Sequence, residues 1–397
     1  MAQIIELKKD RLEVARILHE YVGHYQKSYP LWGEQRKIVS DLIHCRTAYL
    51  GGHIERCTHC GVERIQYHSC RNRHCPKCQH MPRERWLAQR KAEILPTTYF
   101  HVVFTLPHEL NTIILNNKTI MLNILFKAVS QTLLAFGKNE MGAKLGFIAI
   151  LHTWDQQLNA HFHLHCLVVG GAVSLDWTRW IPCNSYLFNE QALSMVFRGK
   201  FMEHMTRSIT TGKLPFAGSY QQLKDRLYEK NWVVSVREPI KHPEHVLEYL
   251  ARYTHRVAIA NSRLTELKHG SVTFRFKDRK ANQVRYKTIT AVDFIRRFLL
   301  HTLPSGFVRI RHYGFLANRN RKNNLAKIRQ LFRLSLQQKQ SASLQHIMLQ
   351  LTGIDITLCP CCKKGKMRVV AQLPPKYRAR HTANLIRPPN HHLAAIP

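Results

Sequence analysis

A run of alternating histidines is the feature of this 397-residue sequence that most limits its fold. His161, His163 and His165 are separated by single apolar residues, and an apolar stretch follows up to Val169. Successive side chains of a β-strand point to opposite faces, so the pattern predicts three imidazoles on one face and apolar side chains on the other. Imidazole is the commonest metal-ligating side chain, so the row indicates a divalent-cation site. The alternative is a half-exposed strand whose histidines have no function.

The neighbouring segments predict the sheet to which this strand belongs. Residues 99–106 and 146–153 have the pattern of strands, and residues 118–136 between them have the apolar periodicity of a long helix. Strand, helix, strand and strand in this order indicate an α+β fold with a central, largely antiparallel sheet and helices packed on one face. We therefore expect the histidines on the free face of the sheet.

Two Cys-x-x-Cys pairs in the N-terminal part predict a structural zinc site. Four thiolates fill the tetrahedral coordination of Zn²⁺, so this metal supports folding and not catalysis. The predicted ligands are Cys57, Cys60, Cys75 and Cys78. Any of four nearby residues is able to replace one of them: Cys70, His59, His68 and His74. The alternative is a set of unligated surface cysteines.

A second cysteine cluster, Cys359-Pro-Cys361-Cys362, resembles half of a zinc knuckle. No further pair follows it, so metal binding there is left open, with His391, His392 or a partner molecule as candidate ligands. The residues from Pro374 onwards are rich in proline, arginine and histidine, which predicts a mobile tail.

The charge of the chain indicates a polyanionic partner. The sequence has 60 Lys and Arg against 25 Asp and Glu, a formal net charge of +35, which makes nucleic acid the leading candidate. The basic residues are spread along the chain, which argues against a membrane surface. We find no secretory signal and no uninterrupted apolar stretch of the roughly 20 residues that span a bilayer. We therefore expect a cytoplasmic, DNA-associated protein.

A basic run in the C-terminal third combines cations with aromatic side chains. It contains almost no acids, which favours contact with DNA over the alternative of a solvated surface. The arginines expected to bind DNA in this run are Arg309, Arg311, Arg319 and Arg321.

Residues 242–256 predict a helix that carries two tyrosines four positions apart. Tyr249 and Tyr253 fall together at the border of its apolar face. Arg252 and Arg256 lie beyond them on the helical wheel, as further DNA-binding candidates. A phenol needs nearby positive charge or proton removal to act as a nucleophile at neutral pH, and these cations supply the charge. The alternative is that both rings only widen the buried stripe.

These motifs together resemble a known family. His163-Leu-His165 resembles the HUH motif of rolling-circle endonucleases. With the cysteine pairs, the strand from His101 to Pro107 and the spacing Tyr249-x-x-x-Tyr253, the chain resembles the two-tyrosine HUH transposases of bacterial insertion sequences. The resemblance implies an HUH endonuclease-like fold and single-stranded DNA as the substrate.

The resemblance also implies a mechanism. A divalent cation, Mg²⁺ or Mn²⁺, would be held by His163 and His165. His161 lies outside the two-histidine motif and is a candidate third ligand from the strand pattern, with His101 and His152 as the other candidates. Tyr249 and Tyr253 would be nucleophiles that form a 5′-phosphotyrosine. Such an enzyme nicks and rejoins DNA at the ends of its element in rolling-circle transposition. Self-association is left open.

These interpretations predict three domains and leave two other functions to consider. Residues 1–95 would form a helical and zinc-ribbon-like module, residues 96–305 the strand-transfer domain, and residues 306–397 a basic extension. A rolling-circle replication initiator or relaxase would use the same chemistry. A non-enzymatic zinc DNA-binding protein would explain the charge and the cysteines, but it would leave the histidines and tyrosines without a role.

Overall fold

The chain divides into two compact units in a computed structural model. Among the described residues, the smaller unit contains residues 44–70 and 356–376, and the larger contains residues 12–43 and 71–355. This division differs from the three consecutive domains expected from the sequence, because a C-terminal strand pairs with the N-terminal hairpin. The structure describes residues 12–91, 93–183, 187–242, 245–246, 253–254, 257–278, 281–334, 343, 345, 348–349 and 353–376.

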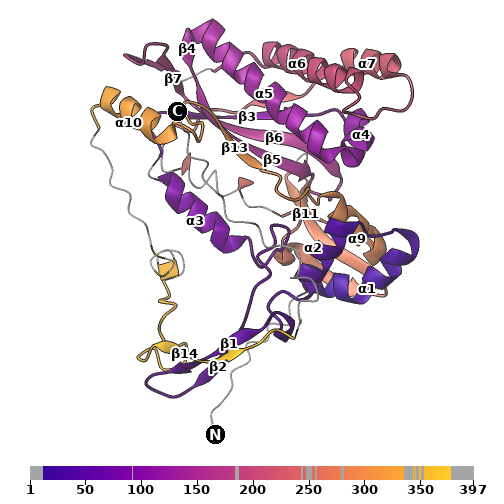
Figure 1. Cartoon of the computed structure of the whole chain (residues 1–397), viewed down its shortest axis with the longest axis vertical. Coiled ribbons are helices and arrows are strands. Elements are labelled where there is room, and N and C mark those ends of the chain that lie inside the picture. The colour runs from indigo at the N-terminus through magenta and orange to yellow at the C-terminus, as the bar shows by residue number, and fades with distance from the viewer. Residues whose placement is uncertain are drawn as a thin grey trace, which may run out of the picture. The chain divides into compact units, whose positions relative to one another are not determined.

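The larger unit is organised around a five-stranded sheet (Figure 1). Its strand order is β13-β5-β6-β3-β9, and each neighbouring pair is antiparallel. The predicted central antiparallel sheet is therefore confirmed, with the histidine strand at its middle. The strands are β3 (Tyr99–Thr105), β5 (Gly146–Trp154), β6 (Ala160–Val169), β9 (Val234–Val236) and β13 (Ile310–Gly314).

Two long helices, α5 (Lys118–Met141) and α6 (Glu190–Thr210), cover one face of this sheet (Figure 1). They pack on the apolar side chains of β3, β5 and β6, and the shorter helices α4 (Asn111–Asn116) and α7 (Tyr220–Tyr228) join the same core. By length and composition α5 is apolar enough to cross a membrane, but 67% of its most apolar window is buried. Its apolar character is therefore that of a core helix.

The opposite face of the sheet carries apolar side chains at one end of its strands and histidines at the other. At one end, Ile148, Leu167 and Val169 pack with residues of α10 (Arg321–Leu331) and with side chains of α3 (His80–Lys91). At the other end lie the histidines of β5 and β6. The expectation that this face is free was wrong, because His163 and His165 are each only 7% exposed.

Among its described residues, the larger unit also contains two smaller sheets and three further helices. The strands β10 (Leu264–Lys268), β11 (Ser271–Asp278) and β12 (Gln283–Thr290) form an antiparallel sheet. Helix α9 (Ala291–Leu300) comes next and lies against α1 (Val14–Ser28), which is followed by α2 (Gly33–Ile43). A further small sheet contains β4 (Ala143–Lys144), β7 (Gly171–Ser174) and β8 (Trp180–Pro182).

The smaller unit is a three-stranded antiparallel ribbon. Its order is β14-β1-β2, so the first strand of the unit is central and the last strand of the described chain lies at its edge (Figure 1). The strands are β1 (Gly52–Cys57), β2 (Glu63–Tyr67) and β14 (Met367–Leu373), preceded by the helical turn η1 (Ala48–Leu50).

The elements predicted around the histidine strand are confirmed within a few residues, except that α5 runs five residues beyond its expected end. The predicted helix at 242–256 lies mostly outside the described residues, and so does the tail beyond residue 376.

Candidate catalytic face and metal sites

Three histidines from the neighbouring strands β5 and β6 lie close together on the face of the sheet opposite α5 and α6. His163 Nε2 lies 3.1 Å from His165 Nε2. His152 of β5 stands directly opposite His163 of β6 in the strand register. One ligand nitrogen from each of the three lies within 4.8 Å of the others, and all three side chains are buried. The spacing of the two Nε2 atoms fits adjacent ligands of an octahedral ion, which are about 3 Å apart when each metal–ligand bond is about 2.1 Å.

The outer nitrogens of these rings are held by hydrogen bonds that set their orientation. His163 Nδ1 donates to the carbonyl of His161 at 2.9 Å, because a carbonyl only accepts. In the neutral ring this leaves Nε2 unprotonated, with its lone pair facing His165. His165 Nδ1 lies 2.8 Å from Nε2 of His101, a buried residue of β3. Such outer contacts fix the ring orientation and tautomer of a metal-ligating histidine.

The structure changes the predicted third member of the set. His161 is exposed and is not part of the three-histidine cluster, although its carbonyl orients His163. It lies near the strand end, where β6 emerges from the turn after Asn159. His152 takes the third position because it lies on the adjacent strand opposite His163. Alternation within one strand was unable to show this, since the signal lies in the pairing of two strands.

Tyr253 lies against the histidine cluster. Its ring centroid is 4.2 Å from that of His165 and 5.2 Å from that of His101. His152 Nε2 donates to the Tyr253 carbonyl at 2.8 Å, so this residue is anchored to β5 by its backbone. The arrangement brings a phenol to the face that carries the imidazoles. The other predicted residues of this helix, Tyr249, Arg252 and Arg256, lie outside the described residues.

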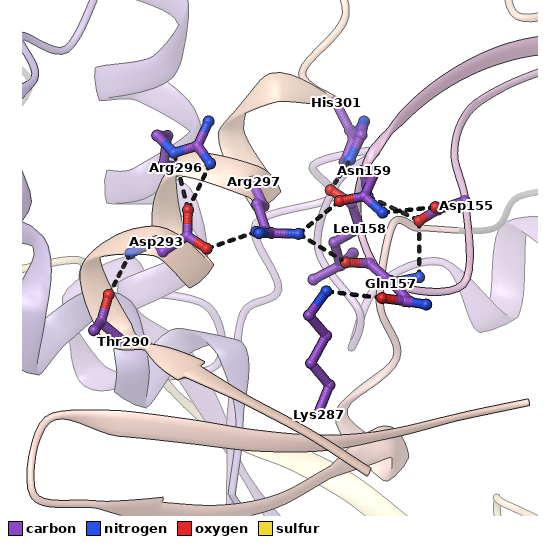
Figure 2. Close-up of polar contacts among 10 residues, drawn as sticks. All are labelled: Asp155, Gln157, Leu158, Asn159, Lys287, Thr290, Asp293, Arg296, Arg297 and His301. Atoms are coloured by element: carbon purple, nitrogen blue, oxygen red, sulfur yellow. Dashed lines mark hydrogen bonds and ion pairs between the residues drawn. The ribbon is translucent and has the colours of Figure 1, made fainter. Parts of the chain in front are cut away.

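The turn between β5 and β6 fixes the two histidine-bearing strands relative to each other (Figure 2). The Asp155 carboxylate accepts from the backbone N–H groups of Gln157 and Asn159, both at 2.8 Å. Leu158 adopts a positive φ of 64° inside this turn. An aspartate that binds its own following backbone stabilises a tight turn, which keeps the strand ends close together.

Polar contacts tie this turn to α9 and β12 (Figure 2). Arg297 of α9 donates to Asn159 Oδ1 at 2.6 Å and pairs with Asp293 at 2.7 Å. Lys287 of β12 donates to the Gln157 side chain at 2.7 Å. The second sheet and its helix therefore hold the end of the hairpin that carries the metal-site histidines.

His301 closes the base of the same turn. Its Nε2 donates to the Leu158 carbonyl at 3.2 Å, and its Nδ1 lies 3.3 Å from the Thr153 hydroxyl. Burial lowers the pKa of His301 to about 4, so the ring is neutral at neutral pH. The Trp154 ring contacts both His301 and the histidine cluster: its centroid lies 6.0 Å from that of His301 and 4.9 Å from that of His152.

The arginines expected to bind DNA occupy different environments. Arg319 is exposed. Arg311 packs over an aromatic ring of α5 at 4.0 Å, and Arg321 lies 3.3 Å from a carboxylate of the larger unit. Arg309 donates to a glutamine side chain at 3.0 Å, and its burial lowers its pKa to about 10. Three of the four arginines are therefore already engaged by the protein itself.

Four cysteines of the smaller unit form a cluster that the sequence did not predict. Cys57 Sγ lies 3.7 Å from Cys362 Sγ, and Cys60 Sγ lies 3.7 Å from Cys359 Sγ. All four sulfurs lie within 4.8 Å of one another. A disulfide would need about 2.0 Å, whereas the sulfurs of a tetrahedral zinc site are about 3.8 Å apart for zinc–sulfur bonds of about 2.3 Å. The donor set and spacing fit Zn²⁺.

The prediction that Cys57 and Cys60 share one zinc site with Cys75 and Cys78 was therefore wrong. Pairing of β14 with β1 brings the C-terminal pair to Cys57 and Cys60 and fills the four positions. Cys75 and Cys78 belong to the larger unit, where both are buried and the Cys78 N–H donates to the Cys75 carbonyl at 3.1 Å.

Two family models match the chain. One, described as a transposase zinc-binding domain, matches residues 17–106, and one described as a putative transposase matches residues 146–324. The putative transposase y4qJ of Sinorhizobium fredii (strain NBRC 101917 / NGR234) is 43% identical over 373 residues, which cover 89% of this chain and 94% of the relative. The chain belongs to the insertion-sequence transposases.

A second relative of this transposase comes from Pseudomonas savastanoi pv. phaseolicola. It is the transposase for insertion sequence element IS801, 24% identical over 308 residues, with 75% of this chain and 74% of the relative covered. No solved structure matches the transposase. The matches confirm the resemblance to transposases with an N-terminal zinc-binding domain.

Proposed function

We propose that this transposase nicks and rejoins single-stranded DNA at the ends of its element, through a tyrosine nucleophile beside a histidine-bound divalent cation. The observation that carries the proposal is the pair of facing Nε2 atoms of His163 and His165, 3.1 Å apart, with the Tyr253 ring 4.2 Å from His165. The family models and relatives support transposition, and the antiparallel sheet with its central histidine strand supports an HUH endonuclease-like fold.

The histidine cluster has the properties of a catalytic cation site. The lone pair of His163 Nε2 faces His165 in a buried position, so a cation between the rings would satisfy both nitrogens. His152, His163 and His165 would hold Mg²⁺ or Mn²⁺, and three protein ligands leave positions for water and phosphate oxygens. When bound, this ion would polarise the scissile phosphate and stabilise the charge of its transition state.

The tyrosines would carry the covalent step. The phenolate oxygen of Tyr253 or Tyr249 attacks the phosphorus, the bond from phosphorus to the 3′-oxygen breaks, and that oxygen takes a proton. The products are a 5′-phosphotyrosine and a free 3′-hydroxyl. Attack of a 3′-hydroxyl on the phosphotyrosine reverses the chemistry and releases the tyrosine, so rejoining needs no external energy source. Two tyrosines allow one cut end to be held while another cut is made.

The remaining predicted residues have supporting roles in this proposal. The zinc-binding domain and the basic surface would position the DNA, with Arg252, Arg256 and the exposed Arg319 as candidate contacts. Cys75 and Cys78 stay a predicted zinc-ligand pair of the larger unit. The work of the enzyme would take place in the cytoplasm, with the DNA.

The test is covalent trapping on DNA. Purified transposase is incubated with labelled single-stranded oligonucleotides from both ends of its element, with Mn²⁺ or Mg²⁺, and separated under denaturing conditions. We expect a metal-dependent protein–DNA adduct that is lost when Tyr249 and Tyr253 are both replaced by Phe. Tyr286→Phe is the matched control, because Tyr286 is 65% exposed and lies on β12, outside the histidine cluster.

The outcomes separate the candidate functions. An adduct that survives loss of both tyrosines would overturn the assignment of the nucleophiles. DNA binding without any adduct in either metal would favour the non-enzymatic DNA-binding protein. Cleavage and joining of a plasmid origin, but not of element ends, would favour a replication initiator or relaxase.

A further inference from the structure

The C-terminal cysteine pair lies outside both family models, which end at residues 106 and 324. In the structure it is nonetheless part of the ribbon formed by β1 and β2. β14 pairs with β1 along its whole length, from Gly52 opposite Leu373 to Cys57 opposite Met367. This pairing brings the segment just before β14, with Cys359 and Cys362, to the end of β1 where Cys57 and Cys60 lie.

The two cysteine pairs have the same backbone geometry. In the first turn, the Gly61 N–H donates to the Cys57 carbonyl at 3.2 Å, and Gly61 has a φ of 70°. In the second, the Lys363 N–H donates to the Cys359 carbonyl at 3.0 Å, and Lys363 has a φ of 58°. A non-glycine residue seldom adopts a left-handed conformation, so its presence at the matching position marks a required turn. Both turns are therefore zinc knuckles by geometry.

Backbone N–H groups of both turns point at the sulfurs. Cys57 Sγ accepts from the N–H groups of His59 at 3.3 Å and Cys60 at 3.4 Å. Cys362 Sγ accepts from the Gly365 N–H at 3.4 Å. Backbone N–H donors of this kind stabilise thiolates. Thiolates are the form of cysteine that binds zinc.

The approach of the second turn to the first leaves no room for a side chain at Gly365. A Cβ built there would lie 2.4 Å from Cys57 Sγ and 2.7 Å from the His59 Cβ. The ribbon has few buried apolar side chains to hold this close contact, and Val369 and Val370 of β14 are 52% and 47% exposed. A small unit with so little core needs another source of stability, for which a structural metal is a common solution.

We propose that Cys359 and Cys362 complete a four-thiolate Zn²⁺ site with Cys57 and Cys60, so that the zinc-binding ribbon is built from both ends of the chain. The metal joins residues about 300 positions apart in sequence. The ribbon is unable to close until β14 has been synthesised, after the whole larger unit. A C-terminal truncation before Cys359 would therefore remove two of the four proposed ligands of this zinc.

Metal content of the full-length chain tests this site. Zinc per chain is measured by elemental mass spectrometry in the wild type, in Cys57→Ser/Cys60→Ser, in Cys359→Ser/Cys362→Ser and in the quadruple variant. We expect each double variant to lose one zinc and the quadruple variant to lose no more than either. Cys361→Ser is the matched control and should keep its zinc, because Cys361 is exposed and outside the cluster.

Two results would overturn the proposal: full zinc in Cys359→Ser/Cys362→Ser, or a quadruple variant that loses the sum of two separate sites. Protection from alkylation provides a measurement that needs no substitution and so is independent of misfolding. In the wild type, Cys57, Cys60, Cys359 and Cys362 should become reactive together as a chelator is added, while Cys361 reacts throughout. Reaction of Cys359 and Cys362 before any chelator, with Cys57 and Cys60 protected, would also refute the shared site.

Discussion

The histidine face and the cysteine ribbon bring their proposed metal ligands together in opposite ways. The proposed ligands of the histidine face lie on β5 and β6, two strands joined by a short turn, and a large apolar core on the other side of the sheet supports their geometry. The proposed ligands of the ribbon come as two cysteines from the N-terminal part of the chain and two from the C-terminal part, and the ribbon has little core of its own. A site on a preformed sheet needs the metal for chemistry, whereas a site that joins distant segments needs it for folding.

The largest expected effect is the loss of DNA cleavage in variants of the histidine face, and it distinguishes a metal needed for chemistry from one needed for folding. His163→Ala or His165→Ala should lower the rate of DNA cleavage by about 1,000-fold or more, because the metal supplies several kcal/mol of transition-state stabilisation. Zinc content and DNA binding should be unchanged. Cys359→Ser/Cys362→Ser should show the converse, with one zinc lost and Mn²⁺ still bound by the larger unit. Both sets of variants are checked by elemental analysis for zinc, by Mn²⁺ titration and by single-turnover cleavage of DNA. Loss of both zinc and Mn²⁺ binding in either variant would contradict the assignment of separate roles to the two sites.

The same contrast explains what could be predicted from the sequence. Alternation along residues 161–169 predicted the strand, its two faces and three histidines on one face, because this information is local to one strand. The choice of His163 and His165 among the three came from the resemblance to the HUH motif. The role of His152 depends on the register of β5 against β6, which a single strand does not contain. The cysteine grouping was wrong because proximity in sequence was taken as proximity in space. Nothing local to residues 57–78 indicates that β14 lies beside β1.

A smaller effect concerns how firmly the sheet orients its ligands. His101 is a positioning residue in the proposed site, since its Nε2 lies 2.8 Å from His165 Nδ1 and opposite the metal-facing nitrogen. His101→Gln should weaken Mn²⁺ binding by about 10–100-fold, the usual cost of losing an outer contact to a ligand. Excess Mn²⁺ should restore much of the cleavage rate, which a general loss of structure would not allow.

The matched control for His101 is His161→Gln. His161 is exposed and contributes its backbone carbonyl to His163, so its side chain is dispensable for this contact. We expect the Mn²⁺ affinity of His161→Gln to stay within about twofold of the wild type. This change is much smaller than the weakening expected when a ligand loses a hydrogen-bond partner, as in His101→Gln. Equal losses in the two variants would mean that His161 is itself a ligand, as the row of three alternating histidines first indicated.

The smallest expected effect is the acid sensitivity of the hairpin that carries the histidines. The folded-state pKa of His301 is about 4, below its ordinary value of about 6.5, because burial disfavours the charged ring. The unfolded chain therefore binds more protons between these values, and stability falls as the pH drops through this window. His301 alone should cost about 2 kcal/mol of unfolding free energy between pH 7 and pH 5.

Tryptophan fluorescence isolates this effect from the ribbon. All six tryptophans lie at positions of the larger unit, so urea unfolding followed by their emission does not report the acid release of zinc from the smaller unit. His301→Gln, which retains an N–H donor for the Leu158 carbonyl, should be less stable at pH 7 but should lose about 2 kcal/mol less than the wild type on acidification. An unchanged pH dependence would show that other buried groups control acid stability and that the hairpin is not held through a neutral His301.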